Sequence, residues 1–154
     1  MNRAVAEALV RAAQAQAALA AGRGDAPFGA VLADADGRVL LRAANAQASA
    51  SDPTAHAEIM LIRLAAREAG LAVLDGLTVA TNAEPCSMCL SGLVKSRVAA
   101  IVYGAPQEPH ADPAIGAEEV VARSRHGVEL TGGVLAAECA AQIAAARRDG
   151  PVPD

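Results

Sequence analysis

The chain has 154 residues, with 13 Lys and Arg against 17 Asp and Glu and a net charge of −4. That length fits a single domain with its own hydrophobic core, so residues 1–154 are expected to form one domain. The acidic balance argues against a large electrostatic footprint on nucleic acid, which usually needs a clustered basic face, although it does not exclude a local basic groove. With one Phe, one Tyr and no Trp, aromatic platforms for single strands are nearly absent.

The sequence also bears on location. No apolar run reaches the ~18–20 residues of a membrane span, so no membrane association is expected. Residues 1–22 are rich in Ala but are interrupted by charged and amide side chains, which indicates an amphipathic helix and not a secretory signal. Three cysteines are too few and too unevenly spaced for a disulfide framework. We therefore expect a cytoplasmic protein, whose thiols stay available as metal ligands.

Helical stretches alternate with short β-like runs along the chain. A first helix over residues 2–20 precedes two strands, 29–33 and 38–42, which flank an Asp/Gly turn typical of a hairpin. A polar loop over 45–54 leads to a buried helix over 56–69. Strands joined through helices imply right-handed crossovers and a layered α/β/α sandwich. The remaining expected elements are strand 77–81, helix 86–96, strand 98–103, helix 117–125, strand 127–131 and helix 134–147.

Two short segments, residues 54–58 and 84–89, carry side chains with metal-ligand chemistry, and each falls where a helix is expected to begin. Cys86 and Cys89 are spaced i, i+3 and therefore share one face of a helix. Backbone N–H groups and the helix dipole at that end stabilise thiolates. Pro85 suits the entry to a helix because its missing N–H costs little there.

Two thiolates and one imidazole make three protein ligands, which is the open zinc pattern with the fourth position left for water. The sequence therefore predicts Zn²⁺ held by His56, Cys86 and Cys89. A closed structural site would normally need a fourth Cys or His, and neither His110 nor His126 has motif spacing to a cysteine.

Glu58 follows His56 by two residues, so it would lie beside the metal without being forced to bind it. Zinc lowers the pKa of a bound water toward about 7, and a neighbouring carboxylate can pass that proton to a ring nitrogen. Desolvation in a closed pocket should raise the proton affinity of such a carboxylate. Glu58 is therefore the predicted catalytic residue.

Taken singly, each feature has an ordinary interpretation. An isolated Cys-x-x-Cys can be a redox pair, a lone His at a helix start is more often a capping or buried residue, and Glu58 alone would be a first-turn acid. Their joint occurrence, H-x-E followed by P-C-x-x-C, is the zinc deaminase signature. Two other classes stay open: a catalytically silent zinc domain that serves as a partner subunit, and a thiol redox protein that uses Cys86 and Cys89.

From about Asp25 to the last helix, the chain resembles the cytidine deaminase-like superfamily. Within it, the sequence is similar to the branch of guanine deaminases, related nucleoside deaminases and bacterial tRNA adenosine deaminases. Residues 52–60 are very close to that branch's zinc-helix motif, and residues 27–31 resemble the segment that guanine deaminases place under the base. The resemblance implies an α/β fold with a five-stranded mixed sheet, helices on both faces, and a homodimer.

The resemblance also implies which residues meet the substrate. Asn45 stands where the branch carries a substrate-contacting Asn, and the backbone near Ala30 and Ala57 is expected to orient the ring. Phe28 is interpreted either as a stacking partner for the base or as a core anchor. The full set predicted to bind substrate is Asn45, Phe28, Ala30, Ala57, Glu84 and Pro85.

The substrate itself is indicated less directly. Residues 128–139 are similar to tRNA adenosine deaminases. Against that substrate, the final segment lacks the basic, aromatic side chains typical of those enzymes, loop 104–110 lacks their pattern, and the net charge is acidic, whereas RNA binding depends on neutralising phosphates.

Guanine deaminases usually carry an acidic pair after a Gly-Phe. Glu118 and Glu119 stand in that region without the Phe, and we interpret them as first-turn helix acids in preference to substrate-facing groups. The sequence therefore predicts a zinc-dependent hydrolase that releases ammonia from a small-molecule nucleobase or nucleoside, with guanine or a related amino-substituted ring favoured. The alternative is a tRNA-specific adenosine deaminase acting at the wobble position.

Overall fold

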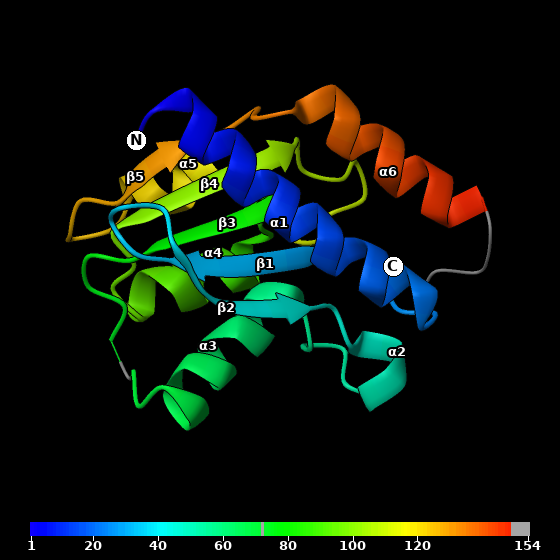
Figure 1. Ribbon diagram of the computed structural model, residues 1–154, viewed down its shortest axis with the longest axis horizontal. Helices are drawn as coiled ribbons and strands as arrows, with labels where there is room; N and C mark the ends of the chain where they lie inside the picture. Colours follow the sequence, from blue (N-terminus) through cyan, green and yellow to red (C-terminus); the bar gives the residue numbers. More distant parts are fainter. Residues whose placement is uncertain (72, 149–154) are drawn as a thin grey trace.

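The computed structural model describes residues 1–71 and 73–148. In that part of the chain, five strands form one mixed sheet in the order β2-β1-β3-β4-β5, with helices on both faces (Figure 1). β1 pairs antiparallel with β2 and β3, whereas the β3–β4 and β4–β5 pairs are parallel. The predicted α/β/α sandwich with a five-stranded mixed sheet is confirmed. The strands are β1 (Gly29–Ala33), β2 (Val39–Ala44), β3 (Thr78–Ala83), β4 (Ala100–Ala105) and β5 (Glu129–Thr131).

The two helical layers differ in origin. α1 and α6, from the two ends of the described chain, pack on one face of the sheet, and α3, α4 and α5 lie on the other (Figure 1). α2 is a single turn inside the segment that was predicted as a polar loop. The helices are α1 (Arg3–Gly22), α2 (Gln47–Ala50), α3 (Ala57–Glu68), α4 (Ser87–Lys95), α5 (Ala117–Ala122) and α6 (Ala136–Arg148).

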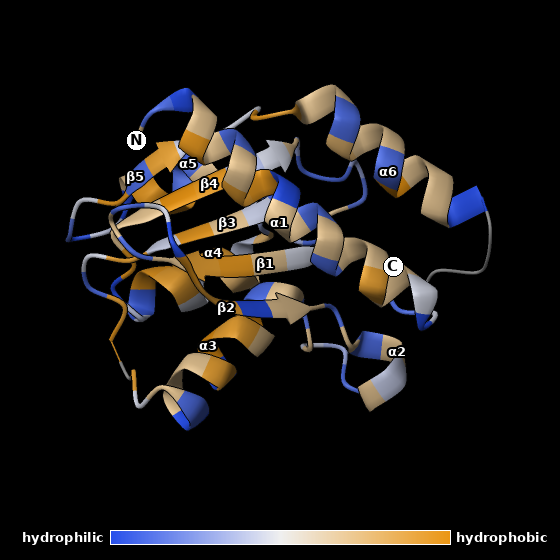
Figure 2. Ribbon diagram, in the orientation of Figure 1, coloured by the Kyte–Doolittle hydropathy of each residue, from blue (hydrophilic) through white to orange (hydrophobic). Residues whose placement is uncertain are grey.

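Burial on both faces explains the apolar character of β1 and β4, whereas the buried β3 also carries Thr78, Thr81 and Asn82. In β1, Ala30 and Leu32 join the core beneath α3 and α4, while Val31 and Ala33 join the core beneath α1 and α6. Figure 2 shows hydrophobic residues along much of β1 and β4 between the two layers. The sheet is therefore a rigid support for the loops at its ends.

Small side chains line the inner face of α1, where it packs against the sheet. The buried positions recur at helical spacing, and most of them are Ala. A Cβ at Gly29 would collide with the backbone of Ala13 and Ala17, so only glycine fits at the start of β1.

Among the described residues, no helix combines the length and apolar character that a membrane span would need.

β3 runs two residues past its predicted end at Thr81. Asn is normally depleted in strands, but the fully buried Asn82 amide is satisfied on both sides. Its Nδ2 donates to the carbonyl of Pro27, and its Oδ1 accepts the N–H of Gly29, both at 3.0 Å. Asn82 thereby joins the entry to β1 with the end of β3, where the cysteine segment begins.

Candidate active site

The two predicted helix starts meet on the same face of the sheet. His56 is the N-cap residue of α3 and Cys86 is the N-cap residue of α4, and both have extended backbone angles. Neither side chain caps its own helix, which leaves both available as ligands. α3 and α4 pack against each other, so the fold brings two segments together that are 30 residues apart in sequence.

His56, Cys86 and Cys89 form a compact group in which the ligand atoms all lie within 4.8 Å of one another. The Sγ atom of Cys86 is 3.6 Å from Nδ1 of His56. Cys89 is fully buried one turn into α4, while the other two side chains are half-buried. One imidazole and two thiols at this spacing are a donor set that suits Zn²⁺.

The ionisation of these three groups is coupled. The pKa of Cys86 is lowered to about 4, chiefly because Cys89 hydrogen-bonds to its sulfur, with His56 contributing a second hydrogen bond. The same bond to Cys86, together with burial, raises the pKa of Cys89. Hydrogen bonding to Cys86 raises the pKa of His56. Two thiolates at this distance repel each other unless a cation lies between them, which is what a coordinated metal ion supplies.

Glu58 lies in the first turn of α3 with 7% of its surface exposed. Burial raises the pKa of its carboxyl group above the usual range. Glu58 lines the same cavity as His56 and Cys86. A carboxyl group with raised proton affinity at this place is suited to proton transfer near neutral pH.

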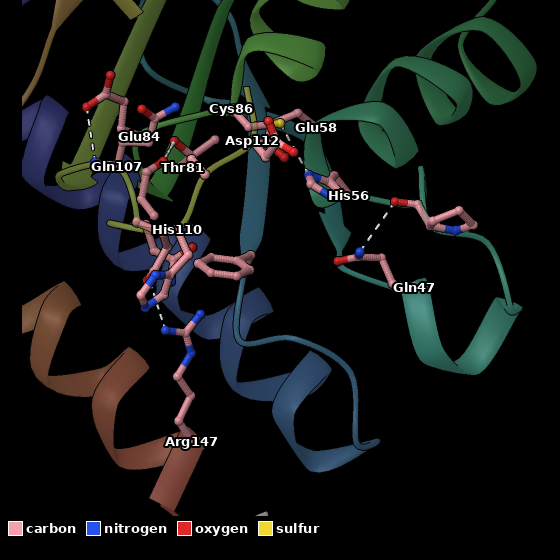
Figure 3. A pocket seen from close by; sticks show the side chains of 16 residues that line it. Gln47, His56, Glu58, Thr81, Glu84, Cys86, Gln107, His110, Asp112 and Arg147 are labelled. Carbon is pink, nitrogen blue, oxygen red and sulfur yellow. Dashed lines mark hydrogen bonds and ion pairs between the residues drawn. The ribbon is translucent and has the colours of Figure 1, made fainter. Parts of the chain in front are cut away.

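These side chains face a cavity of about 390 Å³ (Figure 3). Its volume falls within the range of small-molecule sites. Phe28, at the entry to β1, contributes an apolar part of the wall. Sequence reasoning assigned no role at the site to several other lining residues, among them Gln47, Gln107, Glu108, His110, Asp112 and Arg147.

Of the residues predicted to bind substrate, Phe28 and Glu84 line this cavity, whereas Asn45, Ala30, Ala57 and Pro85 are not among its lining residues. Ala30 is buried within β1, and Ala57 is buried at the first position of α3. Pro85 comes directly before the Cys86 N-cap. Glu84 presents a carboxylate whose two oxygens both accept backbone N–H groups.

The amide of Asn45 is engaged with Gln47. Its Nδ2 donates to Oε1 of Gln47 at 2.7 Å, and its Oδ1 accepts the N–H of Gln47 at 3.0 Å. Asn45 is only 1% exposed, so Gln47 presents its amide to the cavity in front of it. The short α2 turn, which the sequence pattern did not indicate, accounts for this arrangement.

A buried carboxylate supports the same turn from behind. Asp25 is fully buried and accepts hydrogen bonds from the N–H and hydroxyl of Ser49, both at 2.8 Å, and from Arg23. Arg23 also donates to the carbonyl of Asn45 at 2.8 Å. Burial acts to raise the pKa of Asp25, but the hydrogen bonds outweigh it, so the pKa is lowered.

The opposite side of the cavity is formed by the β4–α5 loop and the last helix. Arg147, in the final turn of α6, lies 2.7 Å from the carboxylate of Glu108 (Figure 3). His110 and Asp112 are exposed in the same loop. Three prolines that mark a loop were the only local signal for Glu108, His110 and Asp112, and no local signal marked Arg147.

Known proteins resemble this chain over most of its length. Residues 3–105 match the cytidine and deoxycytidylate deaminase zinc-binding region. A tRNA-specific adenosine deaminase from Bacillus subtilis is 34% identical over 133 residues, which cover 82% of this chain and 79% of that protein. The X-ray structure of guanine deaminase from Bacillus subtilis has a TM-score of 0.63 and 33% identity, covering 77% of this chain and 73% of that one.

A third relative is much longer. A tRNA(Ile)-lysidine synthase from Deinococcus radiodurans is 37% identical over 142 residues, which are 91% of this chain but 23% of that protein. The chain thus spans about a quarter of that relative's length. Proteins with three different activities resemble this chain to a similar degree, so similarity by itself does not select a substrate.

Proposed function

The chain belongs to the cytidine and deoxycytidylate deaminase family, and from that membership we propose that it is a zinc-dependent hydrolase that removes an exocyclic amino group from a nucleobase ring. One observation carries the proposal: His56, Cys86 and Cys89 converge within 4.8 Å beside a cavity that the buried Glu58 also lines. A purely structural zinc site has no need of that fourth, carboxylate group.

In the proposed reaction, His56, Cys86 and Cys89 hold the metal. Zinc, when bound, makes a water nucleophilic near neutral pH. Glu58 accepts a proton from the attacking water, delivers it to the ring nitrogen beside the amino-bearing carbon, and then protonates the leaving amine. The carbon–nitrogen bond breaks, ammonia leaves, and the ring keeps a carbonyl, so one water is consumed for each ammonia released.

We propose that Phe28 stacks on the substrate ring. The Phe28 side chain lines the cavity, and the buried Asn82 amide fixes the backbone on both sides of it through Pro27 and Gly29. A stacked base contributes about 1–3 kcal/mol of binding free energy. The core-anchor interpretation also has support, because Phe28 packs against the cluster beneath α1 and α6.

Charge at the rim supports a substrate without phosphate. The carboxylates of Glu108 and Asp112 both line the cavity, and the guanidinium of Arg147 is paired with Glu108. A phosphate would meet more negative than positive charge there and would be repelled. A free base or nucleoside carries no phosphate, so it avoids this repulsion.

The same rim favours guanine or a related amino-substituted ring. Asp112 is exposed where it lines the cavity, and among the described residues its carboxylate forms no hydrogen bond or ion pair. An ionised carboxylate only accepts hydrogen bonds. Guanine carries a ring N–H beside its amino-bearing carbon, whereas adenine has an acceptor nitrogen beside its own, so a carboxylate at the rim suits the guanine pattern better.

The second candidate substrate is the wobble adenosine of a tRNA. Its support is the 34% identity to the tRNA-specific adenosine deaminase of Bacillus subtilis over 82% of this chain. A tRNA would bring phosphates toward the Glu108 and Asp112 side of the cavity, so its binding would have to draw on cations elsewhere.

We also propose a homodimer, for which light scattering should give twice the mass of one chain.

Ammonia release from the purified, zinc-loaded protein tests the proposal. The panel contains guanine, adenine, cytosine, their nucleosides and an adenosine-34 anticodon stem-loop. Turnover of a free base or nucleoside with the stem-loop inert is the expected result. Turnover of the stem-loop alone would establish the second candidate, and no ammonia from any substrate, with zinc bound, would reject deamination in favour of a silent zinc domain.

A further inference from the structure

One carboxylate holds both ends of the loop that forms the cavity's charged side. Loop 106–116 joins β4 to α5 and carries Glu108, His110 and Asp112. At its start, the N–H of Gln107 donates to Oε2 of Glu84 at 3.1 Å (Figure 3). At its end, the N–H of Ala117 donates to Oε1 of Glu84 at 2.7 Å.

Glu84 is itself firmly placed. Its backbone N–H donates to the carbonyl of Ala105 at 2.8 Å, which ties it to the end of β4. Two residues further along the chain is Cys86, the N-cap of α4. The two ends of the loop are also bonded to each other, because Nε2 of Gln107 donates to the carbonyl of Ile115 at 3.1 Å. The Glu84 side chain therefore links the segment that carries Cys86 to loop 106–116.

We propose that Glu84 is a positioning residue that fixes loop 106–116 relative to the metal-ligand group and thereby sets the affinity and selectivity for the substrate. Both of its oxygens already accept backbone N–H groups, and hydrogen bonds to an ionised carboxylate are about twice as strong as neutral ones. Proton transfer remains with Glu58. The statement about substrate rests on the proposed deaminase function, whereas the statement about the loop does not.

Two variants separate this role from a direct contact with substrate. Glu84→Gln keeps the shape but turns an NH₂ group toward one of the two backbone N–H donors, so one anchor is lost. Ala117→Pro removes the other donor without changing any residue near Cys86. Ala117 is the first residue of α5, where Pro is tolerated, and Gly116 has φ −75° and ψ 164°, which a residue before Pro readily adopts.

Amide hydrogen exchange of the zinc-loaded protein measures the loop directly. In Glu84→Gln, exchange over residues 106–117 should rise by roughly tenfold or more, as expected for losing a hydrogen bond to a charged group. Glu118→Gln is the matched control, because it removes the same charge from an exposed position in the first turn of α5. It should leave the exchange unchanged. Equal protection in Glu84→Gln and the unaltered protein would overturn the proposal.

Steady-state kinetics on the substrate identified by the ammonia panel supply the second readout. Both Glu84→Gln and Ala117→Pro should raise KM by roughly tenfold and change kcat by less than about threefold. Both variants should keep one zinc per chain, and the differences in kcat/KM among the panel substrates should become smaller. In a Glu84→Ala background, Ala117→Pro should add nothing. A collapse of kcat with KM and loop exchange unchanged would place Glu84 in the chemistry and contradict the proposal.

The two proposals fail separately. If the unaltered protein releases no ammonia from any substrate, the deaminase function is rejected, and the exchange experiment still decides whether Glu84 fixes the loop. If ammonia is released but the exchange and KM of both variants match the unaltered protein, the function stands and the positioning role is rejected.

Discussion

The two sides of the cavity are built in different ways. The metal-facing side consists of two helix starts, with His56 and Cys86 at N-cap positions. The opposite side consists of a loop and a helix end that meet through Glu108 and Arg147, which are 39 residues apart. On the first side, local backbone geometry sets where each side chain lies on its own helix, and the packing of α3 against α4 brings the two starts together. On the second, only the tertiary fold does, so chemistry and selectivity are expected to respond differently to mutation.

The largest effect is expected on the metal-facing side. Cys86→Ala removes one of the three proposed ligands, so the protein should lose stoichiometric zinc and with it all detectable ammonia release. Metal analysis of the purified variant measures the first effect and the substrate panel the second. Cys139→Ala is the matched control, since Cys139 is a buried thiol in α6 that belongs to the core beneath α1. A Cys86→Ala protein with one zinc per chain would show that the ligand assignment is wrong.

Phe28→Leu should act on binding. Replacing a stacked ring by an aliphatic side chain should raise KM by roughly 10-fold to 100-fold, in line with ~1–3 kcal/mol per stacked base, while zinc content stays at one per chain. Thermal unfolding distinguishes the alternatives for this residue. An unchanged KM together with a lowered melting temperature would mean that Phe28 is only a core anchor.

Asp25→Asn should act through stability and its pH dependence. The hydrogen bonds from Ser49 and Arg23 lower the pKa of Asp25 in the folded chain, so the ionised form stabilises the fold above the ordinary carboxyl pKa of about 4, and this contribution is lost as the pH falls below it. Asp25→Asn should be less stable than the unaltered protein at pH 7, by about 1–3 kcal/mol.

The difference in the free energy of unfolding between Asp25→Asn and the unaltered protein should shrink on acidification below about pH 4. Urea unfolding at pH 7, 5 and 3.5 measures this difference. A constant difference at all three values would mean that the charge of Asp25 does not contribute, and that only the shape of its side chain matters.

The smallest effect is expected at the rim. Arg147→Gln breaks an ion pair whose side chains are 34% and 28% exposed, so the free energy of unfolding should fall by less than about 1 kcal/mol. Zinc content and kcat should not change, because Arg147 lies on the side away from the metal-ligand group. Chemical unfolding and metal analysis check both statements. A loss of zinc would mean that the two sides are coupled more closely than the contacts indicate.

Local sequence signals predicted most of the fold and the metal-facing side. The alternation of apolar runs and helical spacing placed all five strands within two residues of their observed ends, and the apolar pattern was plainest in β1 and β4. The H-x-E and P-C-x-x-C spacings marked His56, Glu58 and Cys86, and the fold brings these residues to one cavity. Their chemical roles remain predictions.

The rest of the site has no local pattern. Arg147 reaches Glu108 only because α6 packs against β4, and no spacing in the sequence encodes that contact. Gln47 lines the cavity because α2 forms a turn that Asp25 holds through Ser49. The contact of the buried Asp25 carboxylate with Ser49, 24 residues away, leaves no periodic signal in the sequence. The role of such a residue is therefore visible only in the tertiary structure.

The proposed deamination is tested by comparing Glu58→Gln with the unaltered protein in one experiment that measures zinc per chain and ammonia release. Glu58→Gln keeps the shape of the side chain but cannot accept the proton. We expect one zinc per chain in both proteins and a roughly 10²-fold to 10⁴-fold lower rate in Glu58→Gln. Equal rates with zinc bound in both would contradict the proposed proton transfer and, with it, the deaminase mechanism.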